Sequence, residues 1–313
     1  MATSENEVLY PPRSRVRDAS TGNWPIPRET LGQTVKRTVL AGAYTLRPKR
    51  LPAIPSMLIM WLRYAFGSPE SRAQLPNPED RLSRMDDLAG MLGRRETDHI
   101  VEGFRRGMHL SGHVMPPKWL APNAICLLMP GRLHIQKNMA RILRSDRYRF
   151  TFDRDPIGVL SGCAAPRDGR VPLTWLHPGM MAVMLDLYDD HVMHTLEVWN
   201  KDCELVGGLF GYAVDETFLL ESMFHTERDT SKLATIALAA QLESWGFAAI
   251  DGDVQKSHLA SLGFESYPRG MKATLSKSKP NAPWGRWRFD DRLDLGNWKP
   301  ADGPCPLKPA VTA

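Results

Sequence analysis

Apolar residues are distributed differently in the first quarter of the chain and in the rest. Up to residue 80 they are scattered among proline, arginine and serine, with little periodicity before Pro55. Pro55 to Phe66 could form a peripheral helix, although packing against the main body is the favoured expectation. Two stretches between 81 and 132, MDDLAGMLGRR and HIVEGFRRG, have helical spacing and are followed by loops with several prolines. We therefore expect a basic, weakly structured extension at 1–80 and a small N-terminal domain at 81–150.

Helical spacing occurs twice more before the pattern changes. Residues 133–150 predict a helix with a basic exposed face, and His177–Asp189 predicts a second helix. From Val192, three segments rich in β-branched and aromatic residues alternate with two polar turns, Asn200–Cys203 and Asp215–Glu216. This alternation is typical of a three-stranded antiparallel meander.

A long apolar helix is predicted after the meander, at Ser231–Trp245, with Asp229 or Thr230 as its N-cap. A short strand at Phe247–Asp251 and a short helix around His258–Leu262 follow. This order of elements is that of acetyltransferase-like domains. We expect an α+β fold, with a GNAT-type domain at 151–275 after a small N-terminal α/β domain. The Pro-rich tail, 276–313, shows no pattern of a core.

Composition narrows the class of protein only slightly. The 313 residues are 42% hydrophobic and 24% charged, as in ordinary globular proteins. The four cysteines form no CxxC pair and no histidine cluster accompanies them, so we expect no disulfide framework or zinc site. The first residues lack an apolar signal core, and Met57–Leu62 is too short to cross a bilayer. A cytoplasmic protein is the simplest expectation.

Most of the net charge lies in the extension. The whole chain has 40 Lys and Arg against 35 Asp and Glu, a net charge of +5. Residues 1–80 hold 11 basic and 7 acidic residues, which leaves +4. Such a segment can contact phosphates, although a solvated tail is its more common role.

Several short motifs occur in a fixed order between residues 197 and 269. They are Glu197-Val-Trp, Glu204-Leu-Val-Gly-Gly-Leu-Phe-Gly, Glu221-Ser-Met-Phe, Thr230-Ser-Lys, Ile250-Asp, His258-Leu-Ala-Ser-Leu-Gly and Pro268-Arg269. In this order and spacing they resemble the leucyl/phenylalanyl-tRNA–protein transferase family. A weaker likeness extends over about residues 100–275.

The resemblance implies an aminoacyltransferase that moves Leu, Phe or Met from an aminoacyl-tRNA to the N-terminal Arg or Lys of a protein. The transferred residue marks that protein for degradation as an N-degron. The chemistry is aminolysis of an ester, in which the amine must be neutral, the oxyanion is stabilised and the ribose oxygen leaves. The implied partners are aminoacyl-tRNA and the acceptor N-terminus, and no cofactor is implied. The sequence does not give the oligomeric state.

The resemblance also assigns catalytic candidates. Asp251 corresponds to the acid that orients or deprotonates the amine, and Glu221 to a glutamate that lines the site and can pair with a cationic substrate. Taken without the family, Asp251 fits a turn cap and Glu221 a buried strand acid paired to an arginine. Asp253 stands where the family has an amide. Two close carboxylates repel each other, which raises the pKa of one of them.

Substrate-binding residues follow from the same resemblance. Leu209, Phe218 and Met223 correspond to an apolar pocket for the transferred side chain, and Trp175 lies in one of the weaker matches. Plain core packing is the alternative role of such strand residues. Leu220 replaces a glycine of the family and should shrink or reshape that pocket.

Basic residues on two predicted helices are the candidates for binding tRNA. They are Lys137, Arg141, Arg144 and Lys232, which could reach the phosphates of the acceptor stem. A solvated charged face is the alternative.

Two other functions stay open. A CoA-dependent N-acyltransferase on the same fold normally has a Gly-rich loop before the long helix. Here residues 227–232 have no glycine, which disfavours that function. A non-catalytic RNA- or protein-binding descendant remains compatible with Leu220 and Asp253.

Overall fold

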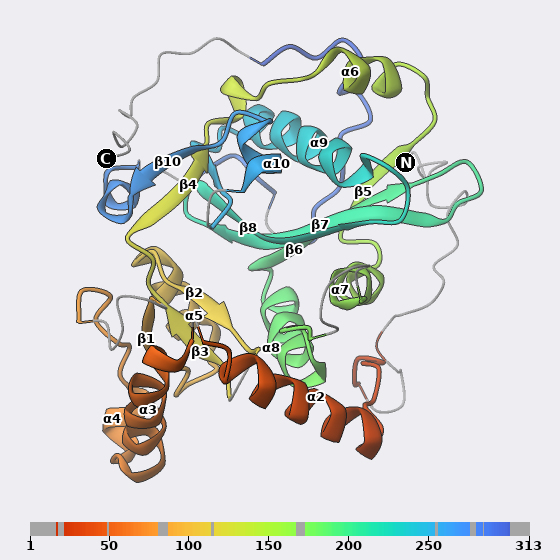
Figure 1. Ribbon diagram of the computed structural model, residues 1–313. Helices are drawn as coiled ribbons and strands as arrows, with labels where there is room; N and C mark the ends of the chain where they lie inside the picture. Colours follow the sequence, from red (N-terminus) through yellow and green to blue (C-terminus); the bar gives the residue numbers. More distant parts are fainter. Residues whose placement is uncertain are drawn as a thin grey trace.

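Two β-sheets form the framework of the protein in the computed structural model (Figure 1). The structure describes residues 17, 22–48, 50–80, 87–113, 116–166, 173–253, 256–275, 280–283 and 285–300. Within these residues the fold is mixed, with helices packed on both faces of the larger sheet (Figure 1).

The larger sheet contains the predicted meander. Its seven strands, in spatial order, are β10 (Glu265–Pro268), β4 (Ala124–Leu128), β9 (Ala249–Asp251), β8 (Thr217–His225), β7 (Leu205–Val214), β6 (Met193–Trp199) and β5 (Arg149–Phe152). Strands β6, β7 and β8 confirm the meander, and the strand predicted at the end of the long helix is β9. Only β8 and β9 pair in parallel.

Each face of this sheet is covered by helices (Figure 1). Helix α9 (Thr230–Ser244), which confirms the long apolar helix, covers one face and is buried along nearly its whole length. Helices α7 (Pro156–Ala164) and α8 (Pro178–Asp189) cover the other face. The start of α7 follows from its sequence, because the Asp155 side chain accepts a hydrogen bond from Gly158 N at 2.8 Å and Pro156 occupies the first turn.

The smaller sheet packs against the α7–α8 side. It consists of β1 (Leu88–Met91), β3 (Lys118–Leu120) and β2 (His109–Ser111), with α5 (Thr97–Arg105) between β1 and β2. The Phe104 ring of α5 stacks on Tyr212 of β7 with ring centroids 4.4 Å apart, and its other neighbour is the buried ring of Trp119. This aromatic contact fixes the smaller sheet relative to the larger one.

The extension contains more regular structure than the sequence indicates. It forms α2 (Leu31–Thr45), η1 (Leu51–Ala53), α3 (Ile54–Phe66) and α4 (Pro69–Ala73). Helix α3 matches the stretch with helical spacing, but α2 was not expected. Its start is defined by a capping box in which Thr30 and Gln33 bond each other's backbone, a local signal that apolar periodicity does not detect.

Two other expectations are corrected. Residues 133–150 form a short α6 (Lys137–Leu143) and then enter β5, because Asp146 takes a left-handed conformation with φ 46° that ends the helical run. The tail also contributes to the core, since Trp287 is only 3% exposed and stacks on His194 with centroids 3.7 Å apart. A single aromatic residue gives no periodic signal. The remaining elements are η2 (Pro130–Arg132), α10 (Ser257–Ala260) and η3 (Arg269–Thr274).

Among the described residues, no helix has both the length and the apolar character needed to span a membrane.

Candidate active site

A cavity of about 430 Å³ lies where the smaller sheet faces the β8–β9 part of the larger sheet. Its lining combines strand residues of both sheets with the end of α7 and the turn after β9. The lining residues that carry polar or aromatic groups are His109, Ser111, His113, Thr174, Trp175, Glu221, Ser222, Asp253 and Lys256. The cavity therefore joins segments that are far apart in the sequence.

A β-bulge presents two successive polar residues of β8 to this cavity. Along β7 and β8, Phe210 pairs with Ser222 and the next residue, Gly211, pairs with Leu220, so Glu221 is the extra residue. In a regular strand, neighbouring side chains point to opposite faces, whereas a bulge can turn two of them to one side. Glu221 and Ser222 accordingly both line the cavity.

The carboxyl group of Glu221 is partly buried and has an unusual acidity. Burial, followed by the negative charge of Asp253, raises its pKa to about 8. The positive charge of Lys256 and a hydrogen bond with the Tyr212 hydroxyl act in the opposite direction. Near neutral pH this group can therefore hold or release a proton.

Asp253 and His109 lie next to each other in the same cavity. Asp253 has φ 64° and a side chain that is 38% exposed, so its carboxylate faces the open part of the site. His109 is 5% exposed, and its Nε2 lies 3.5 Å from Asp253 Oδ1. Within the described part of the chain, this buried nitrogen makes no hydrogen bond. It is available to a bound molecule.

His113 sits at the edge of the cavity against the extension. Its ring stacks on Tyr44 of α2 with centroids 6.3 Å apart. Burial, together with the positive charges of Lys118 and Arg50, lowers its pKa to about 4, so the ring is neutral near pH 7.

Asp251 does not line the cavity but packs behind the turn that carries Asp253, which does line it. Its side chain is fully buried, with Oδ2 3.1 Å from Lys272 Nζ of η3. Its Oδ1 accepts a hydrogen bond from Asp253 N at 3.1 Å. Both carboxylate oxygens are thus engaged within the protein. The bond from Asp253 N is the turn cap that the sequence analysis gave as the alternative role of Asp251. Asp251 holds the turn that carries Asp253.

The residues expected to form an acyl pocket are placed on the other face of the sheet. Leu209, Phe218 and Leu220 are buried, Met223 is partly buried, and all four pack in the core beneath α9. The alternation along β8 explains this, because Phe218 and Leu220 face α9 whereas Glu221 and Ser222 face the cavity. Their placement is the plain core packing that was the alternative.

Trp175 is the one predicted substrate-binding residue that lines the cavity. Its ring lies 6.4 Å from that of Phe210, between centroids, and it packs against the core on the α7–α8 side. Glu221, Asp253 and Trp175 are therefore brought together by the fold.

Comparisons with known proteins agree with the family resemblance of the motifs between residues 197 and 269. The family model described as leucyl/phenylalanyl-tRNA protein transferase matches residues 127–274. A leucyl/phenylalanyl-tRNA–protein transferase of Alkalilimnicola ehrlichii is 34% identical over 238 residues, which cover 75% of this chain and 92% of the relative. One of Pseudomonas syringae pv. syringae is 35% identical, covering 68% of this chain and 90% of the relative. The chain belongs to the leucyl/phenylalanyl-tRNA–protein transferase family.

Solved structures add little to this. One titled "The structure of L-PGS from Bacillus licheniformis" has a TM-score of 0.31 and 8% identity, covering 48% of each chain. A likeness of that size supports no further argument.

The basic residues expected to bind tRNA lie away from the cavity. Lys137, Arg141 and Arg144 are exposed on or just after α6, whose buried Met139 packs in the core on the α9 side. Lys232 lies in the first turn of α9 and pairs with Asp229, with Nζ and Oδ1 3.3 Å apart. The cavity is on the opposite side of the sheet, so these residues do not touch it.

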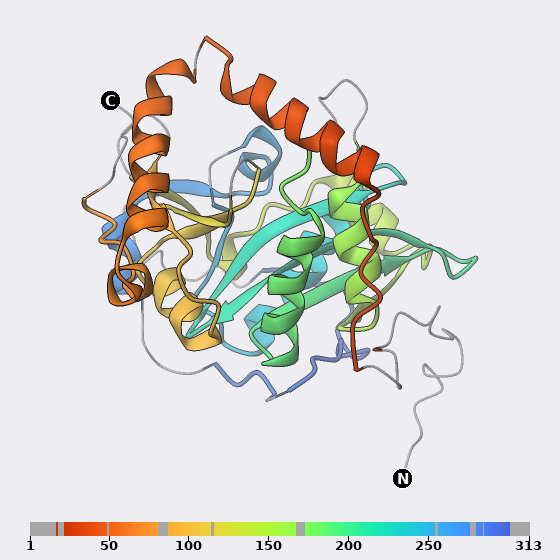
Figure 2. The same ribbon diagram turned by 90° about the horizontal axis from the view of Figure 1, so that it is seen from below.

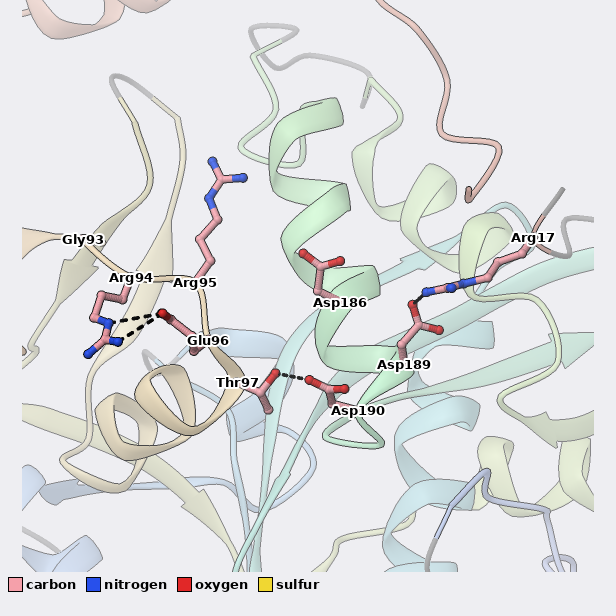
Figure 3. Close-up of a pocket in the computed structure, with 9 residues that line it drawn as sticks. All are labelled: Arg17, Gly93, Arg94, Arg95, Glu96, Thr97, Asp186, Asp189 and Asp190. Atoms are coloured by element: carbon pink, nitrogen blue, oxygen red, sulfur yellow. Dashed lines mark hydrogen bonds and ion pairs between the residues drawn. The ribbon is translucent and has the colours of Figure 1, made fainter. Parts of the chain in front are cut away.

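A second hollow, of about 630 Å³, lies between residues 93–97 and the end of α8 (Figure 3). Its lining is mostly charged: Arg17, Arg94, Arg95, Glu96, Asp186, Asp189 and Asp190. Several of these charges already pair with each other, as Arg17 does with Asp189 and Arg94 with Glu96 (Figure 3). No sequence-predicted site residue lines this hollow.

Six of the polar or aromatic residues that line the cavity were not expected from the sequence: His109, Ser111, His113, Thr174, Ser222 and Lys256. Three come from the β2 region, where a short buried strand carries no functional motif. Ser222 and Lys256 had a usable signal, because Ser222 directly follows Glu221 and Lys256 lies three residues after Asp253. In the described part of the chain, no group of three or more His, Cys, Asp or Glu side chains is arranged to hold a metal ion.

Proposed function

We propose that this protein transfers an aminoacyl group from aminoacyl-tRNA to the N-terminal amine of an acceptor protein at the Glu221 cavity. Family membership supports the reaction class, since the relatives bear the name leucyl/phenylalanyl-tRNA–protein transferase. The observation that carries the assignment of the site is the carboxyl group of Glu221, with a pKa of about 8, beside Asp253. By the family likeness, the acceptor begins with Arg or Lys and the transfer creates an N-degron.

The acidity of Glu221 suits the first proton transfer. An α-ammonium group has a pKa of about 7.7–8.0 in peptides, so its proton passes to a carboxylate of pKa about 8 at little cost in free energy. The negative charge of Asp253 attracts the incoming cation. The neutral amine then attacks the ester carbonyl, forming a C–N bond and a tetrahedral oxyanion.

Collapse of this intermediate breaks the bond to the ribose oxygen. A second proton of the attacking nitrogen passes to that oxygen as it leaves, and Glu221 returns its own proton to water. The buried Nε2 of His109, which lacks a hydrogen-bond partner among the described residues, is suited to bind an oxygen of the substrate. In this mechanism Asp251 is a positioning residue, because its two carboxylate oxygens are engaged by Lys272 and by the backbone of the turn.

The acyl side chain has apolar surface available within the same cavity. Trp175, Leu110 and Leu120 line it. Leu220 fills the space beneath α9 together with Leu209, so a side chain could enter there only if the core rearranged. We therefore place the transferred side chain beside Trp175. The tRNA body is proposed to reach Lys137, Arg141 and Arg144 across the edge of the sheet.

We propose that the acetyltransferase-like unit, in a cytoplasmic protein, is built on the larger sheet. That sheet includes β4 and β5, so the unit begins before the expected boundary at residue 151. A CoA enzyme on this fold would bind pyrophosphate at the start of α9. Here Asp229 stands at the N-cap and the buried Thr230 hydroxyl donates to Val206 O at 2.8 Å. An acid at that position disfavours an anion.

The test uses the purified full-length chain, a mixture of charged tRNAs, and two peptides that begin with Arg, one of them N-acetylated. We expect transfer to the free amine only. Glu221→Gln should reduce kcat/KM by roughly a hundredfold or more, because an amide accepts no proton. Asp202→Asn, in an exposed turn, is the matched control and should keep full activity.

Three outcomes would contradict the proposal. Full activity of Glu221→Gln would remove Glu221 from the mechanism. tRNA binding with no transfer from any aminoacyl-tRNA would indicate a non-catalytic descendant. Acetylation of the peptide from acetyl-CoA would indicate the alternative enzyme.

A further inference from the structure

Exposed apolar side chains are concentrated in one part of the molecule. Every large apolar residue that is exposed in the described chain lies between residues 31 and 66, and Leu31 and Phe66 are 82% and 81% exposed. The full set is Leu31, Val35, Val39, Leu46, Leu51, Leu58, Ile59, Trp61, Leu62 and Phe66. We call residues 31–66 the α2–α3 arm.

The two helices of the arm present these residues in an ordered way. On α2, Leu31, Val35 and Val39 are four residues apart and therefore form one stripe. Helix α3 is apolar around most of its circumference, but only the side with Met60 packs inward, against Leu88 and Met91. A helix that is apolar all round is normally buried on all sides. Here the outer side of α3 faces solvent.

Figures 1 and 2 show α2 and α3 as the two limbs of an elbow on the outside of one end of the molecule. The elbow is held by Tyr44. The guanidinium carbon of Arg50 lies 4.2 Å from its ring centroid and that of Arg47 lies 5.1 Å away, and Arg50 also donates a hydrogen bond to the Tyr44 hydroxyl. Tyr44 stacks on His113 of the cavity. The arm is thereby fixed beside the candidate active site.

The charge of the arm has a single sign. No acid occurs between Glu29 and Glu70, whereas this stretch contains six basic residues: Lys36, Arg37, Arg47, Lys49, Arg50 and Arg63. Arg37 pairs with Glu29 at 2.9 Å just outside the arm. The arm thus combines a surplus of positive charge with exposed aliphatic and aromatic side chains.

We propose that the α2–α3 arm binds the surface of an anionic phospholipid bilayer. Amphipathic helices with basic residues and with Trp, Phe and Leu at the interface bind such surfaces by burying the apolar groups among the acyl chains. Nucleic acid would match the charge but leave the apolar side chains in water. A second copy would match the apolar groups but bring like charges together. An anionic bilayer satisfies both properties.

A consequence concerns the cavity. Because His113 joins the arm to the cavity lining, a bilayer bound to the arm lies close to the mouth of the site. Acceptors held at the membrane surface would then be presented to it. Lipid binding itself does not depend on the proposed acyl transfer, and the two are measured separately.

The test is co-sedimentation of the full chain with vesicles of phosphatidylglycerol and phosphatidylcholine in equal parts, and with pure phosphatidylcholine vesicles. We expect binding to the mixed vesicles only, weakened in about 0.5 M salt. Two variants should each bind at least about tenfold more weakly. They are the triple variant Leu31→Ser, Val35→Ser, Val39→Ser and the double variant Lys36→Glu, Arg63→Glu. Lys201→Glu with Lys299→Glu removes the same charge elsewhere and should bind as the unchanged protein does.

Circular dichroism of each variant checks its folding, and the serine variant should keep acyl transfer to a soluble peptide. The proposal is wrong if the unchanged protein does not sediment with anionic vesicles, or if the arm variants sediment as well as the control. It is also wrong if the chain is a dimer that the serine variant converts to a monomer, since a second copy would then cover the arm. Absence of acyl transfer with intact vesicle binding would contradict the proposed function and leave the membrane proposal standing.

Discussion

At the scale of single residues, Glu221 couples the charge of the site to the stability of the fold. Its pKa is about 8 in the folded protein, against an ordinary value of 4.5. A carboxyl group whose pKa is raised on folding favours the folded state at low pH, where it is protonated in both states. That stability is lost as pH rises from about 4.5 through 8, because ionisation in the folded state is unfavourable.

Glu221→Gln should remove this loss. We expect the variant to gain stability relative to the unchanged protein between pH 5.5 and 8.5, on the order of 2 kcal/mol, because glutamine resembles the protonated group at every pH. Urea unfolding at several pH values measures the difference. A constant difference over this range would mean that the Glu221 carboxyl is not perturbed in the fold.

The buried pair of Asp251 and Lys272 should behave differently. Lys272→Met leaves the Asp251 carboxylate buried without its cation and is expected to destabilise the fold by about 3 kcal/mol or more. Asp251→Asn should destabilise as well, and the double variant by less than the sum of the two. Unfolding midpoints of the three variants give the coupling. Strict additivity would contradict a direct ion pair.

This pair has a bearing on how activity is tested. Loss of transfer in Asp251→Asn would follow from a displaced Asp253 as well as from a missing catalytic group, since Asp251 accepts the Asp253 backbone bond. Glu221→Gln therefore tests the role of a carboxyl group in catalysis more directly than Asp251→Asn does.

At the scale of elements, the bulge between β7 and β8 places Glu221 and Ser222 in the cavity. Position 211 of β7, opposite the bulge in β8, is a glycine. A Cβ atom there would lie 2.1 Å from the Leu219 carbonyl oxygen. The close approach of the two backbones at this point leaves no room for a side chain.

Gly211→Ala should therefore force the two strands apart beside the bulge. We expect a loss of stability of about 2 kcal/mol or more and a fall in acyl transfer, since Glu221 moves with the strand. Gly42→Ala, at a helix position where an added Cβ would meet nothing from the rest of the fold within 4 Å, is the control and should be neutral or slightly stabilising. Thermal unfolding and the peptide assay measure both effects. An unchanged melting temperature in Gly211→Ala would contradict the tight packing.

The meander and α9 could be predicted because their apolar patterns are regular over many residues. The bulge could not, because Leu219-Leu220-Glu221-Ser222 does not reveal which residue is extra. Only the pairing with β7 shows that Glu221 and Ser222 share a face and that Leu220 faces α9. For this reason the family likeness found Glu221, whereas the neighbouring pocket residues were assigned to a face that the core occupies.

At the scale of the whole molecule, the cavity depends on contacts that no single segment encodes. His109 and His113 line the same cavity as Glu221 because the smaller sheet is held against the larger one, with Phe104 stacked on Tyr212. Helix α2 of the arm was missed for a related reason: its apolar residues Leu31, Val35 and Val39 face solvent, so they do not mark a core.

The position of β4 also has a consequence for how the chain is made. This strand, at residues 124–128, pairs with β9 at 249–251 and with β10 at 265–268, so it has no partner in the larger sheet until more than half of the remaining chain exists. Synthesis proceeds from the N-terminus, and contacts between distant segments form slowly. While the ribosome is still translating, the apolar side chains of Ile125 and Leu127 lack the neighbours that later bury them. Until β9 is synthesised, β4 therefore lacks both of the strands that pair with it, and its backbone groups are open to pairing with other chains.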